Sequence, residues 1–266
     1  MAVHRSPYAA GDASAKSIAH TPHFGRTATA LICATLLLSP LARGVAVGQS
    51  QGGGKPPAAA EVPRDAKNSF DELMGGAISD PAEQRSRAES ISKYGTLQQA
   101  EQLLLSGNIT GKAAQQVLAN KIYTESSAAF SKGSESAGSK MQELMAKLMS
   151  AGKPAPDAIA EANQQCRGVH TGAGKLLAAK KKDGTYAVGD PLARATLAKT
   201  VGQFGLYSEG VELLLSGAIS NQEELRTATT RVWEESGPSQ ATELLRDSRV
   251  KDAEVRKGLE KIKRGD

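Results

Sequence analysis

The fold of this chain is decided by two short segments, Leu103–Thr110 (LLLSGNIT) and Leu213–Ser220 (LLLSGAIS). Each contains three leucines, a Gly, an Ile two residues after the Gly, and a hydroxyl residue directly after the Ile. Leu favours helices, Gly often ends them, and Ser or Thr often begins them. The pattern therefore predicts two helices joined by a tight corner, and the chain contains it twice, 110 residues apart.

The similarity between the two copies extends beyond this corner. Residues 80–126 align with residues 190–236 without a gap, and 12 of the 47 aligned positions are identical. Both copies begin with Asp-Pro, which is typical of a helix start because Asp caps the helix and Pro fits its first position. We interpret the similarity as an internal duplication of a three-helix unit.

Four glycines mark the expected corners of the two units. Gly95 and Gly205 follow an aromatic residue, and we predict that both adopt the left-handed conformation that ends a helix. Gly107 and Gly217 are expected to close the second helix of each unit.

Polar residues mark the expected starts of the next helices. Thr96 and Gln99 have the spacing of a capping box in the first unit, whereas the second unit lacks this pair. Thr110 and Ser220 are predicted to cap the third helix of each unit, and Ser220 has Glu223 three residues later.

The remaining sequence also has helical periodicity and almost no strand pattern. Lys140–Met149 is predicted to form a separate amphipathic helix, and Pro154 to open the next one. Lys175–Lys182 is predicted to form a short helix and Glu243–Lys263 a partly exposed terminal helix. The expected fold class is all-α, with about eight to ten short helices stacked as helical hairpins.

The N-terminal region has the features of a secretory signal peptide. A basic segment precedes the uncharged run Ala28–Ala42, and small residues follow. Retention as a membrane anchor is the alternative, although the run is shorter than the about 20 residues of a spanning helix. The expected organisation is a leader (1–48), a flexible Gly/Pro/Ala tether (49–67), a first helical unit (68–135), connecting helices (136–189) and a second helical unit with a charged C-terminal helix (190–266).

The charge of the chain lies mainly in this leader. The whole chain has a formal net charge of +5, but residues 49–266 contain 29 basic and 27 acidic residues. This near balance does not indicate a nucleic-acid partner. The expected partners are other proteins, with contact to a membrane only through an uncleaved leader.

Beyond the leader the chain has one Cys and one His, Cys166 and His170. On a continuous helix, residues four apart share a face, so the two form a weak candidate for a nucleophile–base or metal-binding pair. The alternative is a partly buried Cys and a surface His near a helix end. Because a zinc site needs three or four ligands, no metal and no cofactor is predicted.

Two further segments have some features of a ligand site. Gly172-Ala173-Gly174-Lys175 lacks the spacing, the hydroxyl residue and the preceding strand of a phosphate-binding loop. Lys180, Lys181 and Lys182 form a basic run that is a candidate anion contact, and the alternative is a solvated helix end. The aromatic residues at matching positions of the two units, Tyr94 with Phe204 and Tyr123 with Trp233, are expected in the core, and the alternative is a ligand groove lined by them.

These observations predict an exported, non-catalytic protein that binds other proteins. An accessory or chaperone-like component of a bacterial envelope, secretion or conjugation assembly is the expected role. The alternatives are a membrane-tethered helical protein with an uncleaved leader, and an envelope hydrolase that uses carboxylates or Cys166.

Overall fold

The computed structural model describes residues 64–265, and the regular structure of this part consists of twelve α-helices without a strand. The predicted all-α class is confirmed for these residues, whereas the predicted leader and most of the tether lie outside them. The helices are α1 (Arg64–Met74), α2 (Pro81–Tyr94), α3 (Leu97–Ser106), α4 (Lys112–Ser150), α5 (Ala155–Cys166), α6 (Ala173–Ala178), α7 (Pro191–Phe204), α8 (Tyr207–Ser216), α9 (Gln222–Ala228), α10 (Thr230–Glu235), α11 (Pro238–Arg246) and α12 (Ala253–Arg264).

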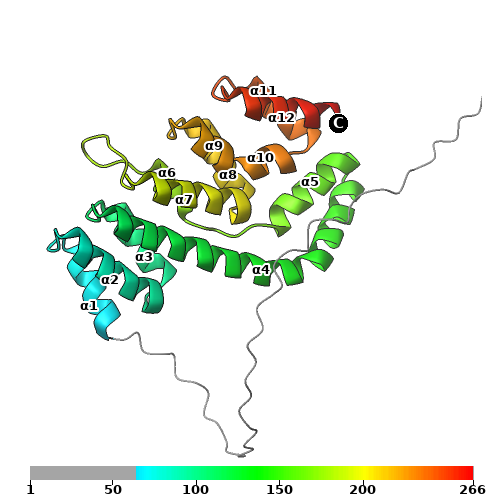
Figure 1. Cartoon of the computed structure of the whole chain (residues 1–266). Coiled ribbons are helices and arrows are strands. Elements are labelled where there is room, and N and C mark those ends of the chain that lie inside the picture. Colours follow the sequence, from blue (N-terminus) through cyan, green and yellow to red (C-terminus); the bar gives the residue numbers. More distant parts are fainter. Residues whose placement is uncertain (1–63, 266) are drawn as a thin grey trace, which may run out of the picture. The chain divides into compact units, whose positions relative to one another are not determined.

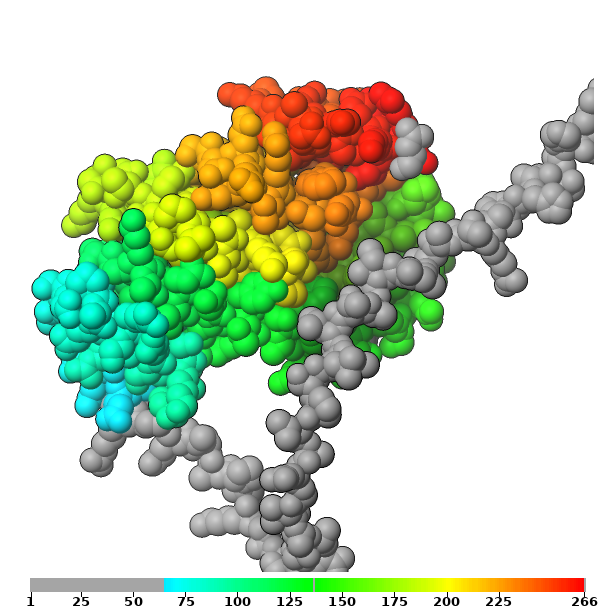
Figure 2. All heavy atoms as spheres, viewed as in Figure 1, coloured from blue at the N-terminus to red at the C-terminus, as the bar shows by residue number. Residues whose placement is uncertain are grey.

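Most helices pack as hairpins that follow one another along the chain (Figure 1). The paired helices are α1 with α2, α3 with α4, α6 with α7, α8 with α10, and α11 with α12. The second helices of the first three hairpins also pack on each other, α2 on α4 and α4 on α7, and α7 packs on α9. Figure 2 shows the result as successive colours from cyan to red across the described part.

Left-handed glycines form the connections within three of these hairpins. The φ values are positive, at 68° for Gly76, 71° for Gly107 and 62° for Gly217. Residues other than Gly rarely adopt such values. In each connection an Ile lies two residues after the Gly, and Ile109 and Ile219 are buried. The predicted roles of Gly107 and Gly217 as helix-closing residues are confirmed.

The prediction for Gly95 and Gly205 is wrong, because both are extended, with φ values of −82° and −62°. These positions lack space for a side chain. A Cβ at Gly95 would lie 2.8 Å from the Ile91 carbonyl oxygen, and one at Gly205 would lie 2.6 Å from the Val201 carbonyl oxygen. The next helix starts within two residues, so the chain turns closely over the end of the preceding helix.

The predicted helix caps are confirmed in part. Asp80 and Asp190 cap α2 and α7, and Thr96 forms the predicted capping box with Gln99. Thr110 and Ser220 are not caps, because α4 and α9 begin one residue later than predicted.

The N-caps at these two starts are Gly111 and Asn221. The Asn221 side chain accepts hydrogen bonds from the N–H groups of Glu223 and Glu224. Asn221 therefore takes the capping role that the sequence pattern predicts for Ser220. Gly111 provides no side-chain cap for α4.

Four predicted boundaries also need correction. α4 continues for 39 residues through the predicted boundary between 135 and 136, so Lys140–Met149 is its last part and not a separate helix. α6 ends at Ala178 instead of continuing through Lys182, and Glu243–Lys263 is divided between α11 and α12. α1 begins at Arg64, within the predicted tether.

Polar side chains link the starts of the second helices in series. The Gln84 side chain lies one turn into α2, and its Oε1 accepts a hydrogen bond from the N–H of Gly111, the N-cap of α4, at 2.8 Å. In the same way Gln115 Oε1, in α4, accepts from the N–H of Asp190, the N-cap of α7, at 2.8 Å. Each helix start thus receives a partner from the preceding hairpin.

Ion pairs continue this pattern toward the C-terminus. Arg194 in α7 contacts Glu224 in the first turn of α9, with Nη2 2.8 Å from Oε2. Arg226 in α9 contacts Asp252, the N-cap of α12, at 3.0 Å. We call these four linking side chains the N-cap ladder: Gln84, Gln115, Arg194 and Arg226.

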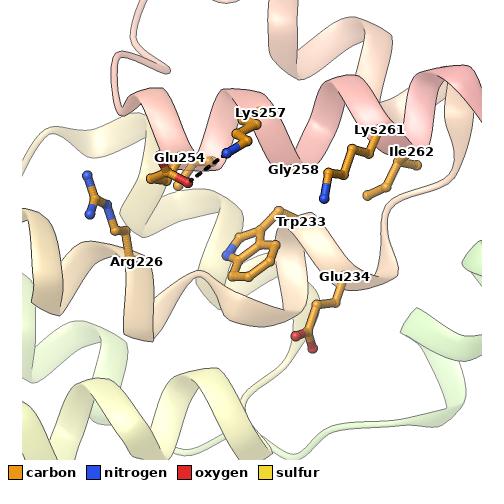
Figure 3. Close-up of a pocket in the computed structure, with 9 residues that line it drawn as sticks. Arg226, Trp233, Glu234, Glu254, Lys257, Gly258, Lys261 and Ile262 are labelled. Atoms are coloured by element: carbon orange, nitrogen blue, oxygen red, sulfur yellow. Dashed lines mark ion pairs between the residues drawn. The ribbon is translucent and has the colours of Figure 1, made fainter. Parts of the chain in front are cut away.

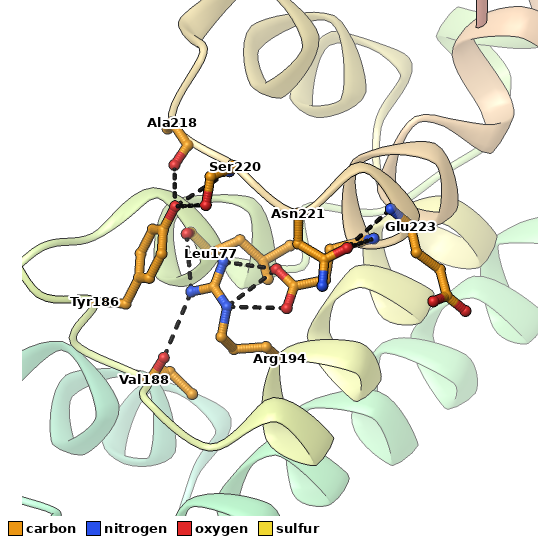
Figure 4. Close-up of polar contacts among 9 residues, drawn as sticks. Leu177, Tyr186, Val188, Arg194, Ala218, Ser220, Asn221 and Glu223 are labelled. Carbon is orange, nitrogen blue, oxygen red and sulfur yellow. Dashed lines mark hydrogen bonds and ion pairs between the residues drawn. The ribbon is translucent and has the colours of Figure 1, made fainter. Parts of the chain in front are cut away.

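Arg194 makes the most contacts in the N-cap ladder (Figure 4). Besides its pair with Glu224, it donates to the carbonyl oxygens of Leu177 and Val188. The Tyr186 ring covers the guanidinium, with the Arg194 Cζ atom 3.8 Å from the ring centroid. The Tyr186 hydroxyl donates to the Ala218 carbonyl oxygen at 2.7 Å, so this cluster joins α6, α7 and the start of α9.

The aromatic residues follow the core prediction only in part. Phe204 packs against Tyr123 and Phe130, with ring centroids 5.2 and 5.6 Å apart, where α4 meets α7. Tyr94 is 43% exposed at the end of α2, so its assignment to the core is wrong. The neighbouring Lys93 covers its ring instead.

Candidate functional site

A cavity of about 360 Å³ lies between α6 and α8 and contains the predicted site residue His170. It brings together one basic, one imidazole and two carboxylate side chains with a small apolar wall. The lining residues are His170, Gly174, Lys175, Ala178, Glu209, Glu212, Leu213 and Ser216.

Glu209 is fixed at the inner side of this cavity. Its carboxylate accepts hydrogen bonds from the N–H of Leu206 at 3.2 Å and from the Thr171 hydroxyl at 3.2 Å. The first bond caps α8, because Leu206 is the N-cap and has no side-chain oxygen of its own. Glu209 therefore holds the segment before α6 against α8, and this limits its freedom to act on a substrate.

A second carboxylate, Glu101 of α3, lies against the backbone of Gly172. A Cβ at Gly172 would collide with the Glu101 carboxylate, and the φ of 66° at this position also requires Gly. Burial raises the pKa of Glu101, and nearby Glu209 raises it further, while His170 and Lys175 lower it. Glu209 is thus committed to hydrogen bonds, whereas Glu101, which does not line the cavity, is partly buried beside it.

The raised pKa of Glu101 predicts a measurable pH dependence of the protein's stability. Because its pKa is raised in the folded state, its contribution to stability is present below the ordinary value of 4.5 and is lost as the pH rises through the folded value. Glu101→Gln is neutral at every pH and lacks this loss. We expect the variant to gain thermal stability relative to the wild type between pH 4 and pH 7, as measured by thermal unfolding. A constant difference in Tm over this range would contradict the shift.

Cys166 and His170 do not form the pair that a continuous helix would give. Cys166 is the last residue of α5, and Gly168 with a φ of 102° turns the chain away. The His170 side chain is 78% exposed, and its Nδ1 lies 4.0 Å from Glu209 Oε1. Cys166 is a free thiol of intermediate burial. The structure therefore joins His170 to the carboxylate site and leaves Cys166 outside the cavity lining.

The segment Gly172–Lys175 forms the start of α6. The space before this helix start is occupied by protein carboxylates. Glu209 accepts from the N–H of Thr171 at 3.4 Å, and Glu101 lies against Gly172. These negative charges disfavour a phosphate at this helix start.

The three lysines lie beyond α6 and not at a helix end as predicted. The Lys180 ammonium is 5.5 Å from the centroid of the Tyr186 ring. A Cβ at Gly107 would lie 3.1 Å from Cε of Lys181, so this side chain covers the α3–α4 corner. Lys182 is exposed. Lys180 is also exposed and contacts its own α6–α7 connection, so only Lys181 packs on a neighbouring hairpin.

Sequence reasoning missed Glu101, Glu209 and the N-cap ladder. One signal was available for the ladder: Gln84 and Arg194 each occur four residues after the capping Asp of an Asp-Pro pair. No comparable pattern indicated Glu101 and Glu209, because their proximity depends on the packing of α3, α6 and α8.

Within residues 64–265 no group of three or more Cys, His, Asp or Glu side chains is arranged to hold a metal ion. None of the helices in this range has both the length and the hydropathy of a membrane span. Comparison of the chain with known protein families, curated proteins and solved structures gave no match.

Proposed function

We propose that this protein is a non-catalytic scaffold that binds other proteins, as an accessory or chaperone-like component of a bacterial envelope, secretion or conjugation assembly. The observation that carries the proposal is the series of hairpins linked by the N-cap ladder. Stacked helical hairpins expose long surfaces made of successive helices, and such surfaces commonly bind proteins.

Exposed apolar side chains on several helices support this role. Leu192 on α7 is 70% exposed, and Met149 and Ile159 at the α4–α5 connection are each 47% exposed. Scattered apolar residues are common on surfaces, so their use in binding has to be tested one at a time.

The test is capture of partners from envelope fractions with the full exported chain, followed by reconstitution with the purified partner. We expect Leu192→Asp or Met149→Asp to weaken that complex at least about tenfold, which corresponds to about 1.4 kcal/mol. Lys182→Asp, also at an exposed position, is the control and should bind normally. Absence of any partner that binds in purified form would contradict the proposal.

We further propose that the scaffold arose by duplication of residues 80–126. Its support is the equal spacing of structural features: α2 and α7, α3 and α8, and the starts of α4 and α9 are each separated by 110 residues. Ion pairs with a buried basic partner have the same spacing, since Lys121 pairs with Glu125 and Arg231 pairs with Glu235.

Export is proposed on the sequence of residues 1–48 alone. N-terminal sequencing of the mature protein tests it, and a start at Val47 or Gln49 is expected after cleavage. An intact leader in the membrane fraction would instead favour the membrane-tethered alternative.

The carboxylate cavity favours an envelope hydrolase as a second candidate. A partly buried Glu101 with a raised pKa is suited to donate a proton, and it lies close to His170, which lines the cavity. The scaffold proposal predicts that Glu101→Gln, Cys166→Ala and His170→Ala retain biological function. Turnover of an envelope polymer that is lost in Glu101→Gln would favour the hydrolase.

A further inference from the structure

A second cavity, of about 450 Å³, lies between α10 and α12 (Figure 3). Its floor is apolar and its rim is charged. The lining residues are Arg226, Trp233, Glu234, Glu254, Val255, Lys257, Gly258, Lys261 and Ile262. A volume of this size is in the range of small-molecule sites in proteins.

Trp233 provides the main apolar surface of the cavity. A Cβ at Gly258 would lie 3.0 to 3.4 Å from atoms of Trp233, so the absence of a side chain there lets α12 lie directly against the indole. Val255 and Ile262, on the same helix, extend the apolar surface. An occupant therefore needs an aliphatic or aromatic body.

The indole also carries a hydrogen-bond donor without a partner. Trp233 Nε1 is buried, and no acceptor lies within hydrogen-bond distance in the described part of the chain. Buried N–H groups are nearly always paired in folded proteins. Because this atom is closed to solvent, it makes no contact with an occupant of the cavity, and the binding surface is the ring itself.

The charges around the cavity favour a negative occupant. Three basic and two acidic side chains line it. Arg226 is paired with Asp252, and Lys257 lies 3.9 Å from Glu254, whereas Lys261 has no ion-pair partner among the described residues. The surrounding segment, residues 246–264, contains eight basic and four acidic residues.

We propose that this cavity binds an amphiphilic carboxylate, that is, a single carboxylate attached to an apolar body. The body packs against Trp233 and Ile262, and the carboxylate lies near Lys261. The proposal goes beyond protein binding, because a small molecule and not a protein occupies the site.

Trp233 is the only Trp of the chain, so its fluorescence reports directly on this cavity. The full chain is titrated with dodecanoate below its micelle concentration, and with dodecyltrimethylammonium as a probe of opposite charge. We expect the Trp233 emission to change and reach a plateau as dodecanoate is added. Dodecanoate should bind at least about tenfold more tightly than the cationic probe.

Charge variants on the rim separate specific binding from general attraction. Lys261→Glu should weaken dodecanoate binding at least about tenfold, and Glu234→Gln should strengthen it. Lys263→Glu is the matched control, because Lys263 lies on the same exposed helix but does not line the cavity. Circular dichroism checks that each variant is folded. No saturable change in emission, equal binding of both probes, or equal effects of Lys261→Glu and Lys263→Glu would overturn the proposal.

Discussion

Arg194→Ala is expected to lower the free energy of unfolding by about 3 to 5 kcal/mol, the range for breaking a buried ion pair by removal of one partner. The side chains of Arg194 and Glu224 are only 6% and 11% exposed. Removal of the guanidinium therefore leaves the Glu224 carboxylate without its counter-ion, and it also removes the hydrogen-bond donor to Leu177 and Val188. Urea unfolding followed by circular dichroism measures the change.

Two variants distinguish this cause from a loss of packing. Arg194→Lys keeps the charge but loses the planar contact with the Tyr186 ring and the two-point pairing with Glu224. We therefore expect a decrease in the free energy of unfolding that is smaller than that of Arg194→Ala. The double variant Arg194→Met with Glu224→Leu removes both charges, and it should be more stable than Arg194→Ala alone. If Arg194→Ala unfolds at the wild-type urea concentration, the ion pair does not hold α7 and α9 together.

Gly202→Ala is expected to destabilise the protein by about 1 to 3 kcal/mol, the usual cost of adding atoms to a well-packed interior. A Cβ at Gly202 in α7 would collide with the backbone carbonyl oxygen of Thr227 in α9. Because this oxygen belongs to a helix backbone, the two helices have to move apart. The position 110 residues earlier is Ser92, so the close approach is particular to α7 and α9.

Gly138→Ala is the matched control, since it makes the same substitution within helix α4. A Cβ at Gly138 would meet no atom within 4 Å beyond its chain neighbours and the backbone of its own helix. Replacement of this exposed Gly should raise stability by about 0.5 to 1 kcal/mol, because Ala has the higher helix propensity. Opposite signs for the two variants support the close packing of α7 on α9. Equal effects would show that helix propensity alone accounts for both.

The sequence predicted the corners of the fold well because their signals are local. The Asp-Pro starts and the left-handed Gly107 and Gly217 depend on the conformations of a few adjacent residues. The predictions were wrong where tertiary packing or the continuation of a helix determines the local structure. Gly95 is extended because the next helix begins almost at once, and α4 continues through Gly133 and Gly138 despite their low helix propensity.

The candidate site was less predictable than the fold. The sequence singles out His170 as the sole His after residue 48, but its neighbours Glu101 and Glu209 come from α3 and α8. Residues so far apart in sequence meet only through the packing of hairpins, which a pattern within one segment does not contain. The pairing with Cys166 was considered because both lie near each other in sequence, and the turn at Gly168 removes the helical geometry that it required.

Each hairpin is joined to the next through the N-cap ladder, and the amide hydrogen exchange of Asp190 tests this central claim most directly. The exchange is measured by NMR in the wild type and in Gln115→Leu. The backbone N–H of a helix N-cap has no partner within its own helix. At Asp190, this N–H donates to the Gln115 Oε1 atom at 2.8 Å. We predict slow exchange in the wild type and at least about tenfold faster exchange in the variant, equivalent to about 1.4 kcal/mol. Equally fast exchange of Asp190 in both proteins would contradict the claim.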